Sequence, residues 1–188
     1  MKPIRRFPVF LSSVVAGAAL VAGAFAWSHW QGQRALPDHP LAPGIAISQQ
    51  LQPKAMRVVV DRDYRTVIDM RPDGEAPDEP GSVLMAAAAK AERLQFAYVP
   101  VPHGDIPDTV VDSLSNALAS RPGPVLLYCR SGRRAARSWS LVEASRPGGM
   151  GVDEIIAAVK ASGQDASDLR ARLEQRMHAR RPIGAPAT

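Results

Sequence analysis

This 188-residue chain contains a single cysteine, Cys129, and its four histidines are scattered along the sequence. One cysteine excludes a disulfide framework within the chain, and the scattered histidines have no metal-ligand spacing, so we expect no metal and no other cofactor. Aromatic residues make up 5% of the chain and are not interspersed with the basic residues, which argues against nucleic acid as a partner. The net charge of +5 therefore indicates a small anionic substrate or a membrane surface.

The first 30 residues differ in composition from the rest of the chain. Three basic residues precede an uncharged run at residues 7–27, which is long enough to cross the roughly 30 Å hydrocarbon core of a bilayer. The charges before the run place its N-terminus in the cytoplasm. We expect residues 1–30 to anchor an extracytoplasmic, periplasmic domain to the membrane. The alternative is a cleaved signal peptide, for which residues 24–26 have the small-x-small form.

The remaining chain alternates short apolar runs with amphipathic stretches, after a polar, proline-containing linker at residues 31–43. We expect one catalytic domain at residues 44–180 and a tail at residues 181–188. The expected strands are residues 45–48, 66–70, 96–99 and 125–128, and the expected helices are residues 53–63, 80–93, 108–120, 133–145, 152–162 and 167–180. This alternation predicts an α/β fold with a mainly parallel sheet of about four strands flanked by helices.

Three polar turns follow expected strands, at residues 71–75, 103–108 and 129–134. In a parallel sheet, functional groups gather beyond the carboxyl ends of the strands. We therefore expect these three turns to meet at one edge of the sheet.

The turn that contains the only cysteine has the strongest chemical signal. A strand that ends at Cys129 and leads through an arginine-rich turn into a helix directs backbone N–H groups and a positive helix end at the sulfur. Such surroundings lower a cysteine pKa from about 8.5 to roughly 3.5–7.5, which makes the thiolate available. The alternative is a small buried hydrophobic residue at a strand end. The predicted nucleophile is Cys129, with Arg134 lining the loop and Arg130, Ser131, Gly132 and Arg133 binding the substrate.

Four separated motifs, at residues 47–50, 66–75, 123–126 and 129–134, resemble those of a known family. The likeness runs from about residue 44 to about residue 173, and the family is the phosphatase-like domain of beta-lactamase-hydrolase-like proteins. The resemblance implies a fold similar to that of cysteine-dependent protein phosphatases, and members have been described both as phosphatase-like and as sulfurtransferases. Gln49 stands where the family usually has glycine, and Arg133 where threonine is common.

The spacing within the cysteine turn favours sulfur transfer. Protein tyrosine phosphatases have an arginine six positions after the cysteine, where this chain has Ala135, whereas Arg134 lies five positions after it. That shorter turn resembles the loop of single-domain rhodaneses, which holds a cysteine persulfide. Tyr128 also replaces the histidine that commonly precedes a phosphatase cysteine.

Three functions remain open from the sequence. The first is a sulfurtransferase that takes sulfur from thiosulfate or a persulfide and passes it to a thiol acceptor. The second is a phosphatase that acts on a phosphate ester, forms a phosphocysteine and needs a general acid, for which Asp105 is the best candidate against a plain solvated loop residue. The third is a redox sensor without enzymatic activity. Arg137 and the arginines of residues 170–181 are expected to face solvent.

Overall fold

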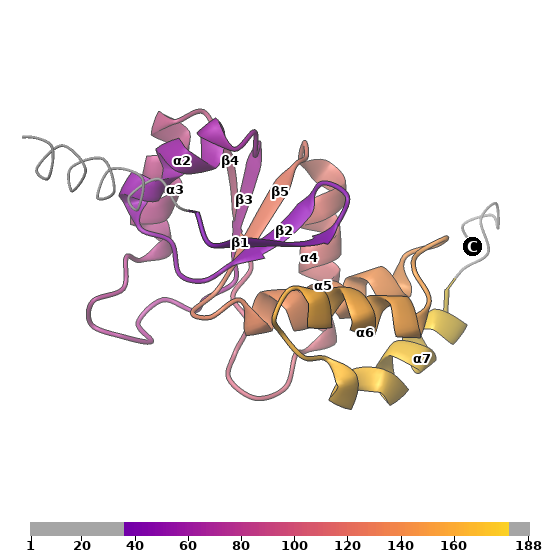
Figure 1. Ribbon diagram of the computed structural model, residues 1–188. Helices are drawn as coiled ribbons and strands as arrows, with labels where there is room; N and C mark the ends of the chain where they lie inside the picture. The colour runs from indigo at the N-terminus through magenta and orange to yellow at the C-terminus, as the bar shows by residue number, and fades with distance from the viewer. Residues whose placement is uncertain (1–35, 181–188) are drawn as a thin grey trace, which may run out of the picture. The chain divides into compact units, whose positions relative to one another are not determined.

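The computed structural model describes residues 36–180, which form a five-stranded sheet with helices on both sides (Figure 1). The strands are β1 (Asp38–Ala42), β2 (Ile45–Ser48), β3 (Thr66–Asp69), β4 (Gln95–Tyr98) and β5 (Val125–Tyr128). The helices are α2 (Met56–Asp61), α3 (Ser82–Ala91), α4 (Asp108–Ser120), α5 (Arg133–Ser145), α6 (Val152–Ala161) and α7 (Arg170–His178). Two short 3-10 helices, η1 (Pro53–Ala55) and η2 (Ser167–Leu169), precede α2 and α7.

The strand order is β1-β2-β5-β3-β4, so the strand that leads to the cysteine lies at the centre of the sheet. Strands β2, β5, β3 and β4 are parallel, and their last residues, Ser48, Tyr128, Asp69 and Tyr98, stand side by side in the register. The loops that leave these strands therefore begin at the same edge, as the sequence predicted.

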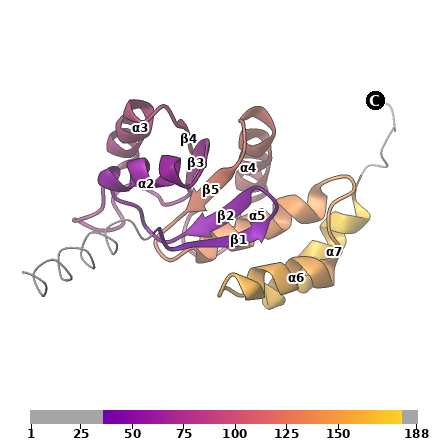
Figure 2. The same ribbon diagram turned by 45° about the horizontal axis from the view of Figure 1, so that its top comes forward.

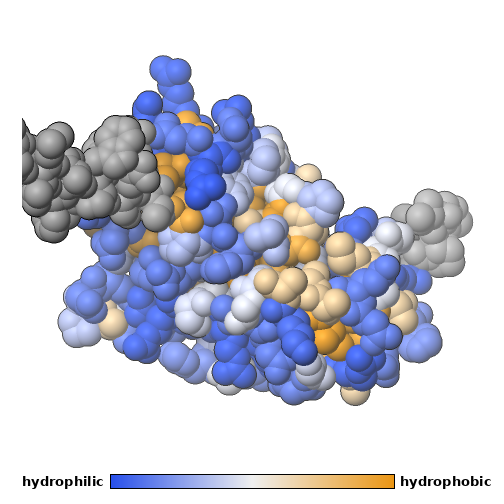
Figure 3. All heavy atoms as spheres, in the orientation of Figure 1, coloured by the Kyte–Doolittle hydropathy of each residue, from blue (hydrophilic) through white to orange (hydrophobic). Residues whose placement is uncertain are grey.

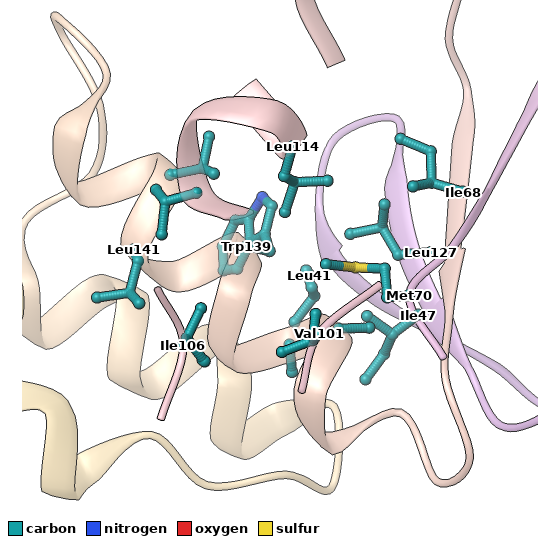
Figure 4. Close-up of a cluster of buried hydrophobic side chains, with 14 of the residues drawn as sticks. Leu41, Ile47, Ile68, Met70, Val101, Ile106, Leu114, Leu127, Trp139 and Leu141 are labelled. Carbon is teal, nitrogen blue, oxygen red and sulfur yellow. The ribbon is translucent and has the colours of Figure 1, made fainter. Parts of the chain in front are cut away.

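Two apolar cores hold the helices against the sheet. Helices α2 and α3 cover one face through Met56, Val59 and Met85, whereas α4 and α5 cover the other (Figures 1 and 2). The second core surrounds Trp139, which is 1% exposed (Figure 4). All four residues of β5 are buried, because a central parallel strand is covered on both faces. Figure 3 shows that one face of the molecule is mostly hydrophilic, with apolar residues gathered in a few patches.

The structure corrects the expected sheet in one respect. The expectation was about four strands, with residues 31–43 as a linker, but residues 38–42 of that segment form β1, antiparallel to β2. Proline in this segment disfavours a strand in general, but an edge strand tolerates it because one side of its backbone has no neighbour. Pro40 occupies such an edge position, opposite Ala46.

The predicted membrane anchor at residues 1–30 lies outside the described residues, and the periplasmic location stays a prediction. Within residues 36–180, no helix has the length and apolar character needed to cross a bilayer.

Candidate active site

The cysteine loop connects the central strand β5 directly to helix α5. Its turn requires Gly132, whose φ of 86° is left-handed and whose Cβ position would lie 3.3 Å from the side chain of Ile47. Residues other than glycine rarely adopt that conformation. Helix α5 then begins at Arg133, so the positive end of a 13-residue helix faces the loop.

The backbone carbonyls of the loop are engaged, whereas its N–H groups are not. The carbonyl of Arg130 accepts a hydrogen bond from the N–H of Gln50 at 3.3 Å, and that of Ser131 accepts one from Gln164 Nε2 at 3.1 Å. Within residues 36–180, no hydrogen-bond acceptor pairs with the backbone N–H of residues 130–135. Six consecutive N–H groups without an acceptor form a preorganised site for an anion.

Cys129 itself is completely buried and belongs to the second apolar core. The hydrogen bond from Arg134 to Glu75 is the main cause that raises the pKa of the Arg134 guanidinium, and the side chain of Cys129 makes a smaller contribution in the same direction. The burial fits the inert alternative and the unpaired loop amides fit the catalytic one. Cys129 has no exposed surface, so a substrate needs an opening that leads to its sulfur.

Arg134 is fixed by a bidentate ion pair with Glu75. Its Nη1 and Nη2 donate to the two carboxylate oxygens of Glu75 at 2.5 and 2.7 Å, and Nη1 also donates to the carbonyl of Val101 at 2.9 Å. These bonds leave two guanidinium hydrogens without an acceptor among the described residues, the Nε–H and the second Nη2–H. Together these two can bind two oxygens of an anion. The hydrogen bond from Arg134 is the main reason that the pKa of Glu75 falls to about 2.

Glu75 also joins the three predicted turns. Its Oε2 accepts from Arg71 Nε at 3.0 Å, and its Oε1 lies 3.1 Å from His103 Nε2. Arg71 in turn contacts Glu79 and donates to the side chain of Gln50 at 2.9 Å. The expectation that the turns at 71–75, 103–108 and 129–134 meet at one edge is confirmed. The sequence placed Glu75 in the turn at residues 71–75 without suggesting this bridging role.

A pocket of about 380 Å³ lies over the cysteine loop. It is lined by His103, Gly104, Ile106, Arg130, Ser131, Arg133, Arg134 and Arg137. Of the predicted site residues, Arg130, Ser131, Arg133 and Arg134 line it, whereas Gly132 and the buried Cys129 do not. None of the described lining residues is a carboxylic acid. Across residues 36–180, no three His, Cys, Asp or Glu side chains are grouped as a metal site.

Asp105, the predicted general acid, is not among these lining residues. Its side chain is 87% exposed, and its Oδ1 accepts from Arg172 Nη1 at 3.0 Å and from the N–H of Ile106 at 2.8 Å. The structure therefore places it as a solvated loop residue bound to helix α7, and the general-acid role stays a prediction.

Arg137 differs from its expected position. It lines the pocket, and its side chain is 14% exposed because its guanidinium forms a bidentate pair with Asp168 at 2.5 and 2.8 Å. The sequence signal for this placement is the spacing from Arg133 to Arg137, since residues four apart share one face of a helix. The side chains of Arg172 and Arg176, expected in a solvated face, are 24% and 17% exposed and hold the 105–108 loop.

The comparisons with known proteins agree with this architecture. A family model, the phosphatase-like domain of beta-lactamase hydrolase-like protein, matches residues 39–148. A beta-lactamase hydrolase-like protein from Xylella fastidiosa strain Temecula1 is 36% identical over 121 residues, which are 64% of this chain and 28% of that protein. The chain thus spans just over a quarter of the length of this curated relative.

Solved structures show the same fold. A phosphatase candidate from Neisseria meningitidis is 28% identical, with a TM-score of 0.66, over 76% of this chain and 99% of that chain. The active form of Tk-PTP is 14% identical, with a TM-score of 0.56, over 77% of this chain and 97% of that chain. Helices α6 and α7 lie beyond the residues that the family model matches.

Proposed function

The chain belongs to the family of the phosphatase-like domain of beta-lactamase hydrolase-like proteins, and we propose that it is a sulfurtransferase that carries sulfur on Cys129. The fold and the family are those of cysteine-dependent, phosphatase-like enzymes. The finer choice of sulfur transfer rests on one observation: among the described residues that line the pocket there is no carboxylic acid to protonate a leaving alkoxide.

Sulfur transfer through Cys129 needs no proton donor. The Cys129 thiolate attacks the outer sulfur of thiosulfate, the sulfur–sulfur bond of thiosulfate breaks, and sulfite leaves with the electron pair. An acceptor thiolate then attacks the outer sulfur of the Cys129 persulfide, and Cys129 leaves as a thiolate. The six unpaired loop amides and the free edge of Arg134 stabilise the negative charge in both steps.

Phosphatase activity is the second candidate, because the family and its structural neighbours are described as phosphatase-like. Phosphoryl transfer to Cys129 requires a donor for the leaving oxygen. His103 occupies the pocket, whereas Asp105 does not. In this reaction we expect His103→Asn to lower turnover more than Asp105→Asn.

Two assays on the full chain separate the candidates. We expect thiosulfate treatment to add one sulfur to Cys129, detected by mass spectrometry of the intact protein, and we expect turnover with thiosulfate and cyanide. Cys129→Ser should abolish both, whereas Arg57→Ala, whose side chain is 69% exposed on α2, should change neither. An unmodified thiol together with hydrolysis of an aryl phosphate would reverse the assignment, and inactivity in both assays would favour a redox sensor.

A further inference from the structure

We propose that the pocket contains a second anion subsite, formed by Arg130 and Arg133, which selects acceptor thiols that carry carboxylate groups. The inference rests on the proposed sulfur transfer and names the class of acceptor for it. It follows from the distribution of charge in the pocket and from the size of the pocket.

Four guanidinium groups line the pocket, and within residues 36–180 two of them have carboxylate partners. Arg134 is neutralised by Glu75, and Arg137 is neutralised by Asp168. Both pairs are bidentate, so these two arginines are held in place and contribute little net charge. Their role is to shape the pocket and to present the donors that remain.

The other two arginines carry uncompensated charge. Arg130 and Arg133 are exposed, and across residues 36–180 neither has a carboxylate within ion-pair distance. Arg133 also contributes to the lowered pKa of the Asp168 carboxyl, but less than the hydrogen bond from Arg137 does. Two unpaired guanidinium groups beside a cavity without acidic lining attract a ligand with negative charge of its own.

The pocket is also larger than the reacting group requires. Its volume of about 380 Å³ falls within the range of about 300–1,000 Å³ for pockets that bind organic molecules. Thiosulfate has only five heavy atoms and occupies the loop amides and Arg134. The remaining space, next to Arg130 and Arg133, accommodates the body of an acceptor.

The acceptor step gives this subsite a defined purpose. The acceptor thiolate forms a new bond to the outer sulfur while the bond between that sulfur and Cys129 Sγ breaks, and no net oxidation takes place. A carboxylate of the acceptor that binds the two arginines holds its thiolate over the loop. Arg130 and Arg133 thus offset the repulsion between two anionic sulfurs.

An acceptor series tests this assignment directly. With thiosulfate as donor, kcat/KM is measured for mercaptosuccinate, with two carboxylates, and for 2-mercaptoethanol, with none, at equal thiolate concentrations. We expect mercaptosuccinate to be preferred, and we expect Arg133→Ala and Arg130→Ala each to reduce the ratio by about two- to fivefold, since an exposed ion pair contributes up to about 1 kcal/mol. Arg133→Lys should retain most of the preference.

The ratio of the two kcat/KM values does not depend on changes in the thiosulfate step, because both reactions share that step. Arg57→Ala, which removes an exposed arginine that does not line the pocket, should leave the ratio unchanged. Raising the salt concentration should lower the ratio in the wild-type protein. An equal rate with both acceptors, or a preference that survives Arg130→Ala combined with Arg133→Ala, would overturn the subsite.

A binding measurement separates this inference from the proposed function. Calorimetry on the full-length Cys129→Ser variant compares the binding affinities of (methylthio)succinate and 2-(methylthio)ethanol. Neither compound has a free thiol, so neither can react. Preferential binding of the dicarboxylate that is lost with Arg133→Ala supports the subsite even where sulfur transfer is absent. Sulfur transfer without any such binding preference rejects the subsite and leaves the proposed function intact.

Discussion

Two ion clusters border the pocket, and they differ in their exposure to solvent. The inner cluster consists of Arg71, Glu75, Glu79 and Arg134, and the exposed fractions of these side chains are 8%, 9%, 5% and 16%. The outer cluster consists of Asp105, Asp108, Arg172 and Arg176, in which the two carboxylates are 87% and 74% exposed. Each cluster fixes a loop that lines the pocket.

Arginine–carboxylate pairs contribute differently to stability in the inner and the outer cluster. Exposed ion pairs contribute about 0–1 kcal/mol because water and salt screen them. A buried pair gains little over apolar packing, yet removing one partner leaves an uncompensated charge at a cost of about 3–5 kcal/mol. The inner cluster therefore determines the geometry of Arg134, whereas the outer cluster only adjusts the position of the 105–108 loop.

The largest effect is expected from Glu75, which bridges both arginines of the inner cluster. Glu75→Gln removes the negative charge and should destabilise the fold by roughly 2–3 kcal/mol at pH 7, because the pKa of Glu75 lies at about 2 in the folded protein. This contribution is complete above the ordinary value of about 4.5 and is lost as the pH falls through about 2. Urea unfolding of the wild-type protein and of Glu75→Gln at pH 7 and pH 3 measures this contribution to stability.

Asp153→Asn is the matched control for Glu75→Gln, since Asp153 pairs with Arg170 but its side chain is 86% exposed. We expect Asp153→Asn to change the free energy of unfolding by less than about 1 kcal/mol. Glu75→Gln should also remove most of the proposed sulfur transfer, because Arg134 loses its orientation. Equal stability losses in the two variants would mean that burial does not distinguish the clusters.

A second expected effect concerns Asp69, a buried carboxylate beside the inner cluster. Within the described residues it has no ion-pair partner, and its Oδ1 accepts the N–H of Arg71 at 3.0 Å. Burial is the main cause that raises the pKa of Asp69 to about 6. A raised carboxyl pKa favours the folded state below about pH 4, and this advantage is lost as the pH rises to about 6.

Asp69→Asn should therefore change the pH dependence of stability. The free energy of unfolding of the variant, relative to wild type, should increase by about 2–3 kcal/mol between pH 4 and pH 7. The asparagine side chain retains an oxygen for the Arg71 N–H. Urea unfolding at both pH values measures this difference. A constant difference between the two proteins across this range would contradict the assignment.

Much of the fold could be predicted from sequence because its signals are local. Helices 108–120 and 133–145 and strands 45–48 and 125–128 have the predicted bounds, since apolar periodicity and the turn residues define them. Strand β1 was missed because its pairing with β2 is a tertiary contact, and its own composition, with Pro40, indicates a linker.

The site was predictable only to the level of its loops. Strand topology brings the three turns together, but the partner of each side chain depends on distances that no local pattern contains. Glu75 and Arg134 are 59 positions apart, and Asp105 and Arg172 are 67 positions apart. The sequence therefore identified the arginine of the cysteine loop without identifying its carboxylate, and it identified Asp105 without the arginine that binds it.

The smallest expected effect concerns Arg172, the centre of the outer cluster. Its guanidinium donates to Asp105, to Asp108 at 2.7 Å and to the carbonyl of Ile106 at 2.6 Å. Arg172→Ala should lower the free energy of unfolding by about 1 kcal/mol, because two of these acceptors are exposed, and should leave the proposed sulfur transfer within about twofold. A loss comparable to that of Glu75→Gln in urea unfolding would show that helix α7 is as important as the inner cluster for holding the pocket, although it lies beyond the residues that the family model matches.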